Sequence, residues 1–137
     1  MFDRIMLPVD LAHVETLGKS IEVATEMAKA HDASITVVGV TGTGPGPLAR
    51  TPAGYVEKLD SFASDLARKS GADVASHAIA DPDPAADLSD ALLGAAKDME
   101  ADLIVMASHV PGVMEHVFSS HAGYVASHAK CSVAVVR

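Results

Sequence analysis

The sequence predicts an α/β domain built on an open, doubly wound sheet of five parallel strands, in the order 3-2-1-4-5, with helices on both faces. Short apolar runs alternate with segments of helical periodicity, in the order β-α-β-α-β-α-β-α-β. The runs at residues 102–106 and 132–136 do not alternate with polar residues, which is typical of strands covered on both faces. Right-handed crossovers then favour a sheet that grows outward from the first strand and returns to place the fourth beside it.

The first half of the chain predicts two strands, one helix and a long loop. Residues 4–9 read Arg-Ile-Met-Leu-Pro-Val and form the first expected strand. A helix is expected over residues 14–31, because apolar residues recur there at spacings of four, three and four. The β-branched run at residues 34–40 predicts the second strand. Residues 41–52 are expected to form a loop, and we interpret its glycine- and proline-rich run at residues 42–47 as a flexible linker or a partner-facing loop. The residues of the helical face are Leu17, Ile21, Ala24 and Ala28.

The middle of the chain predicts two helices around a third strand. An amphipathic helix is expected at residues 54–70, with Gly71 where a helix end favours a left-handed residue. Residues 73–80 carry the third strand, whose signal is weakened by alanine and serine. Asp83 can cap a helix that has Pro84 in its first turn. The inner face of this helix is formed by Leu88, Leu92 and Ala95.

Length, charge and cysteine content restrict the class of protein. We expect a single domain over residues 1–137, because 137 residues with 49% hydrophobic content can bury their own core. A formal charge of −8 without clusters of basic residues disfavours nucleic acids and anionic membranes as partners. The single cysteine, Cys131, cannot form an internal disulfide and is interpreted as a small buried hydrophobe. Since no secretory signal or membrane-spanning run is found either, a cytoplasmic location is expected.

The topology predicts where a ligand would bind. Open α/β sheets bind ligands outside the carboxyl ends of the strands, here where the connections from the first and fourth strands leave in opposite directions. Asp10 should face Ala107 across this crevice, and the segment from Ala107 to His121 is the expected working surface. A carboxylate accepts hydrogen bonds from ribose hydroxyls, and a short helix opened by Ser119 and Ser120 would suit a phosphate. Together they favour a nucleotide. In the alternative that the residues leave open, Asp10 and the serines are ordinary caps.

Three segments give the chain a resemblance to the universal stress protein family, of the UspA-like type. They are Pro8-Val9-Asp10, residues 102–109 (Asp-Leu-Ile-Val-Met-Ala-Ser-His) and residues 128–136 (His-Ala-Lys-Cys-Ser-Val-Ala-Val-Val). The resemblance spans the full chain. It implies the fold and strand order given above, ATP bound between the first and fourth strands, dimerisation through the last strand, and a regulatory role. It also implies that Asp10 is the ribose-side carboxylate and that Val40 is the backbone position that meets adenine.

The glycine motif of the family's nucleotide-binding members is altered in this chain. That motif has Gly, two residues, Gly, about nine residues, and Gly followed by Ser or Thr. Its glycines fall here at Ala107, Val110 and Ser119, with Ser120 at the hydroxyl position, so all three are missing. The intervening loop is also one residue short, as in a proline-containing branch of the family, and branched Val110 would crowd a phosphate.

We therefore expect a degenerate site for an adenine nucleotide (ATP, ADP or AMP). The positions that would contact the base match the family better than those that would contact the phosphates. Mg²⁺ would accompany a triphosphate. The family's pattern and the predicted crevice together define the candidate binding residues. These are Pro8, Val9, Asp10, Val40, Ala107, Ser108, His109, Val110, Ser119, Ser120 and His121.

Catalytic and metal-binding roles have weaker support in the sequence. His13, His109 and His121 could approach Asp10 in the crevice, but no closely spaced helical pair of histidines supports a metal site. Ser108 and His109 are neighbours on an extended segment, so their side chains point apart and do not form a hydrolase dyad. No catalytic or metal-binding residue is therefore assigned.

The expected function is that of a stress-type regulatory or binding module. Residues 132–136 form an apolar strand at the sheet edge, which predicts a homodimer paired through that strand. The sequence does not indicate any other protein partner. Two alternatives stay open: a dimeric interaction module that needs no nucleotide, and a slow ATP hydrolase in which Asp10 helps to hold a metal.

Overall fold

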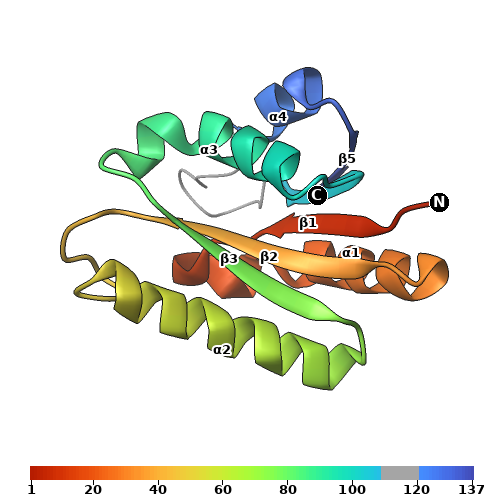
Figure 1. The fold of residues 1–137 in the computed structure, drawn as a ribbon, viewed down its shortest axis with the longest axis horizontal. Coiled ribbons are helices and arrows are strands. Elements are labelled where there is room, and N and C mark those ends of the chain that lie inside the picture. Colours follow the sequence, from red (N-terminus) through yellow and green to blue (C-terminus); the bar gives the residue numbers. More distant parts are fainter. Residues whose placement is uncertain (109–120) are drawn as a thin grey trace.

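The computed structural model describes residues 1–108 and 121–137. Its five strands form one parallel sheet in the order β3-β2-β1-β4-β5, which confirms the predicted fold class and strand order (Figure 1). The elements are β1 (Arg4–Pro8), a 3-10 helix η1 (Leu11–Thr16), α1 (Gly18–His31), β2 (Ser34–Thr41), α2 (Pro52–Ser70), β3 (Val74–Ala80), α3 (Pro84–Asp98), β4 (Leu103–Ala107), α4 (Ala122–His128) and β5 (Ser132–Val136).

The helices cover the sheet in two layers. Helices α1 and α2 lie on one face, and α3 and α4 lie on the other (Figure 1). Because successive side chains of a strand point to opposite faces, Ile5 and Leu7 pack under α1 and α2, whereas Met6 packs under α3 and α4. Every residue of β4 is buried, as expected for a central strand without polar alternation. Complete burial of one such side chain contributes about 1.5–3 kcal/mol to stability.

The helix ends follow local capping chemistry. Gly71 ends α2 with a φ of 73°, the left-handed conformation expected there. Helix α2 begins at Pro52, two residues before the predicted start, because the Thr51 hydroxyl accepts a hydrogen bond from the Gly54 amide at 3.1 Å. Asp83 caps α3 as predicted, since its carboxylate accepts a hydrogen bond from the Ala86 amide at 3.4 Å.

The predicted start of the first helix was wrong. The helix expected over residues 14–31 is divided into η1 and α1, which begins only at Gly18. The chain turns at His13, whose φ of −135° is not helical, and buries Leu17 at the junction. The last helix was expected to open at Ser119 and Ser120. Helix α4 begins at Ala122 with His121 at its capping position, and both serines lie outside the described residues.

Candidate functional site

Strands β1 and β4 are joined at their amino ends and unpaired at their carboxyl ends. The Asp102 carboxylate accepts hydrogen bonds from the amides of Asp3 and Arg4, at 2.8 and 3.1 Å, and ties the two strand beginnings together. The pairing then ends before either strand does. The two residue pairs along β1 and β4 are Ile5 with Leu103 and Met6 with Ile104.

Pro8 explains why the pairing of β1 and β4 ends early. The Val9 amide donates to the Val38 carbonyl of β2 at 2.9 Å. Since successive amides of a strand point to opposite neighbours, the nitrogen of Pro8 faces β4. Proline has no N–H to donate, so the hydrogen-bond ladder cannot continue towards the strand ends. The sheet therefore opens between β1 and β4, next to Asp10.

Asp10 is held in a defined orientation by its own turn. Its Oδ1 accepts a hydrogen bond from the Ala12 amide at 3.0 Å, and its Oδ2 lies 2.9 Å from Nδ1 of His13. This hydrogen bond and the negative charge of Asp10 raise the pKa of His13, with a smaller contribution from Glu15, against a lowering by burial. Asp10 is therefore a cap, the alternative that the sequence left open, and its side chain is 15% exposed.

A cavity of about 370 Å³ lies beside Asp10 at the carboxyl ends of β1 and β2. Its volume falls within the range of about 300–1,000 Å³ that is usual for small-molecule sites. Two of the candidate binding residues, Asp10 and Val40, line it. The loop of residues 42–49, which the sequence suggested was a linker or partner surface, forms much of its wall. The other lining residues are Leu11, Thr41, Tyr55, Pro82 and Pro84.

The described wall of this cavity suits an uncharged, partly planar group. It carries one carboxylate, that of Asp10, and no lysine, arginine or histidine. The rings of four prolines provide flat aliphatic surface, and they come from the loop, from the turn after β3 and from the first residue of α3. A phosphate beside the Asp10 carboxylate would be repelled by its negative charge, whereas sugar hydroxyls can donate hydrogen bonds to it. The lining prolines are Pro45, Pro47, Pro82 and Pro84.

Sequence reasoning missed Tyr55 as a site residue. The helical periodicity placed it correctly on the inner face of α2, where only 2% of it is exposed. Its position in the first turn of α2 also brings it to the cavity. The signal that could have found it is Gly39, since a residue without a side chain inside a strand often marks a close approach by a neighbour.

The remaining described candidates lie outside the wall of this cavity. Pro8 and Val9 are buried at the end of β1, and Ala107 is buried at the end of β4. The Ser108 amide donates to the Val136 carbonyl at 2.7 Å. Nδ1 of His121 lies 2.5 Å from the Ser89 hydroxyl of α3, so His121 joins α4 to α3. The candidates His109, Val110, Ser119 and Ser120 lie outside the described residues.

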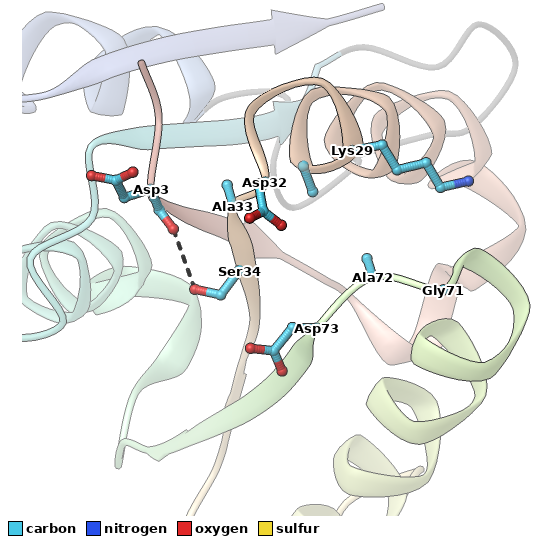
Figure 2. Close-up of a pocket in the computed structure, with 9 residues that line it drawn as sticks. Asp3, Lys29, Asp32, Ala33, Ser34, Gly71, Ala72 and Asp73 are labelled. Carbon is cyan, nitrogen blue, oxygen red and sulfur yellow. Dashed lines mark hydrogen bonds between the residues drawn. The ribbon is translucent and has the colours of Figure 1, made fainter.

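A larger cavity, of about 490 Å³, lies at the opposite edge of the sheet (Figure 2). Asp3, Ser34 and Asp73 line it from the amino ends of three neighbouring strands, and the Ser34 hydroxyl donates to the Asp3 carbonyl at 3.4 Å. Asp32 and Gly71 add the carboxyl ends of α1 and α2, which carry partial negative charge. Because ligands of such sheets bind at the carboxyl edge, we assign the site to the smaller cavity despite its size.

The described residues form neither a metal-binding cluster nor a reactive cysteine site. Within residues 1–108 and 121–137, no group of three or more His, Cys, Asp or Glu side chains could hold a metal ion. Cys131 is partly buried, not fully buried as expected, and packs against the core under α3 and α4. Burial raises the pKa of its thiol, with a smaller rise from Asp102, so the unreactive protonated form dominates at neutral pH.

None of the helices that the structure describes is long and apolar enough to cross a membrane.

Comparisons with known proteins agree with the fold. The chain is similar over its full length to a universal stress protein from Archaeoglobus fulgidus, with 20% identity, 100% of both chains covered and a TM-score of 0.73. A universal stress protein in complex with cAMP has 19% identity, 99% and 97% coverage and a TM-score of 0.72. The Archaeoglobus fulgidus protein in complex with dAMP has 20% identity, 99% and 98% coverage and a TM-score of 0.71.

The family assignment rests on the sequence as well as on the fold. Residues 1–137 match the model of the universal stress protein family, so the match extends over the whole chain. The matched residues include the central strand β1, the following Asp10 and the edge strand β5. The chain therefore belongs to the universal stress protein family.

Proposed function

We propose that the chain is a stress-response binding module that holds an adenine nucleotide, with the nucleoside half in the cavity between Asp10 and Val40. The observation that carries this proposal is the cavity itself, which joins these two residues at the carboxyl edge of the sheet. Two solved structures of similar fold are complexes with cAMP and dAMP, which supports an adenine nucleotide as the ligand.

The end of β2 offers a hydrogen-bonding edge for the base. The pairing of β1 with β2 ends at Pro8 and Val38. The Val38 carbonyl faces β1, because it accepts the Val9 amide, and strand alternation directs the backbone of Val40 to the same side. Val40 thus presents an N–H donor and a carbonyl acceptor beyond the last paired residue of β1. Adenine carries a complementary acceptor and amino donor on one edge.

Titration calorimetry with adenosine, AMP, ATP and GMP tests this proposal. Adenosine and AMP should bind with similar affinity and ATP no more tightly, because the described wall holds no cation for phosphates. GMP should bind more weakly, because guanine presents an acceptor where adenine presents its amino group. No heat with any of them would contradict the proposal and favour the nucleotide-independent interaction module. Phosphate release from ATP that is lost in Asp10→Ala would instead favour the slow hydrolase.

We also propose a homodimer formed through β5 (Ser132–Val136). This strand pairs with β4 on one side and ends the sheet on the other, with Val135 41% exposed. Open apolar strand edges invite pairing with a second chain. Light scattering should give twice the chain mass of 14.1 kDa, shifted to the single mass by Val135→Lys. Val56→Lys on α2, equally exposed, is the control; a native mass of 14.1 kDa would contradict the dimer.

A further inference from the structure

The Tyr55 hydroxyl lies against the backbone of β2 beside the proposed ligand. Tyr55 is fixed in the first turn of α2, where its amide donates to the Thr51 carbonyl at 3.2 Å. Its ring packs in the core shared by α1, α2 and the sheet. A Cβ atom at Gly39 would lie 2.1 Å from the Tyr55 hydroxyl oxygen. The hydroxyl therefore occupies the space of the missing side chain, one residue before Val40.

This hydroxyl is a donor without a partner in the described part of the chain. Buried hydroxyl groups nearly always form a hydrogen bond, yet Tyr55 forms none through its side chain within residues 1–108 and 121–137. Burial and the nearby charge of Asp10 raise the pKa of Tyr55 to about 12, so the group keeps its proton at neutral pH. Tyr55 also lines the same cavity as Asp10.

A donor and an acceptor at one cavity fit a sugar hydroxyl. The Asp10 carboxylate can only accept a hydrogen bond, whereas the protonated Tyr55 side chain can donate one. A ligand hydroxyl can donate to the first and accept from the second at the same time. An amino group cannot accept in this way, and a phosphate cannot donate to Asp10 when fully ionised. The pair therefore selects a hydroxyl-bearing ligand.

We propose that Tyr55 is a second binding residue of this site, and that its hydroxyl and Asp10 together bind one ribose hydroxyl of the nucleotide. This inference rests on the proposed function, because it assigns the sugar to the cavity beside Asp10. It makes the site selective for ribose over sugars that lack that hydroxyl. Gly39 is required by the same arrangement, since a larger residue would displace the tyrosine.

The test compares Tyr55→Phe with the native chain by titration calorimetry. Loss of one hydrogen bond should weaken adenosine binding about 2- to 10-fold. The native chain should also bind either 2′-deoxyadenosine or 3′-deoxyadenosine more weakly than adenosine, and Tyr55→Phe should lose that discrimination. The control is Tyr124→Phe on α4, where the ring is 45% exposed and stacks on His128 at 3.9 Å, and it should bind as the native chain does.

The outcomes separate this inference from the proposed function. Equal adenosine affinity of the native chain and folded Tyr55→Phe would overturn the role of Tyr55 and leave the nucleotide site in place. If the native chain binds adenosine and both deoxy analogues equally well, that result alone would also overturn the role of Tyr55 and leave the nucleotide site in place. Absence of binding by the native chain would overturn both proposals.

Discussion

Replacing Asp10 by alanine is expected to weaken adenosine and AMP binding about 10- to 100-fold. A hydrogen bond to a charged group contributes about 1.5–3 kcal/mol, and each 1.4 kcal/mol is a factor of ten in affinity. Asp10 is the single carboxylate in the described wall of the cavity, so no neighbour there can replace it. Titration calorimetry measures the loss. Unchanged affinity in a folded Asp10→Ala chain would contradict the placement of the sugar beside this residue.

The control for Asp10→Ala must account for the structural role of the carboxylate. Removing the cap should cost about 0.5–2 kcal/mol of folding free energy, which urea denaturation measures separately. Asp65→Ala is a matched control, because Asp65 pairs with Arg68 at 2.9 Å with the same i to i+3 spacing as Asp10 and His13. It lies on the exposed side of α2 and should bind nucleoside normally.

The titration of His13 reports whether the substitution removed the intended charge. Asp10 is the main cause of the raised pKa of His13, through a hydrogen bond and through its charge. In Asp10→Ala, proton NMR should therefore show the pKa of His13 falling towards its ordinary value of 6.5. Asp65→Ala should leave the His13 titration as it is in the native chain.

The fold could be predicted because each strand is defined by a local pattern. The uninterrupted apolar run at residues 103–107 must be buried on both faces, which predicts an interior strand of a parallel sheet. Together with right-handed crossovers, this predicts the observed strand order. Boundaries were less predictable where a tertiary contact decides them. The break before Gly18 depends on Asp10 starting a turn at Leu11 and on the burial of Leu17, which helical periodicity alone cannot distinguish from a continuous helix.

The candidate site was predictable only where it depends on topology. Asp10 follows β1, and Val40 lies at the carboxyl end of the neighbouring β2, so the strand order alone places both at one edge of the sheet. Tyr55 and the loop of residues 42–49 reach the same cavity through the packing of α2, which lies far from Asp10 in the sequence. Their contribution depends on helix placement and loop conformation, and local composition indicates neither.

Substituting Gly39 by alanine is expected to destabilise the fold by about 1–3 kcal/mol, the usual cost of overpacking a buried position. The added methyl group would lie 2.1 Å from the Tyr55 hydroxyl oxygen, 3.0 Å from Cζ and 3.1 Å from Cε1. Tyrosine has few rotatable bonds, and its buried ring cannot move without disturbing the core under α2. Urea denaturation measures the loss. The control is Gly94→Ala in α3, where nothing lies within 4 Å of an added Cβ and where alanine favours the helix.

A double-mutant cycle identifies the clash as the cause of this loss. Tyr55→Phe removes the atom at 2.1 Å but keeps the ring, so Gly39→Ala should cost less in the Tyr55→Phe background than in the native chain. The ring carbons at 3.0 and 3.1 Å remain tight, so part of the cost should persist. Equal costs in both backgrounds would show that the tyrosine hydroxyl does not occupy this space. Because the same contact holds that hydroxyl next to Val40, Gly39→Ala should also weaken adenosine binding, whereas Gly94→Ala should not.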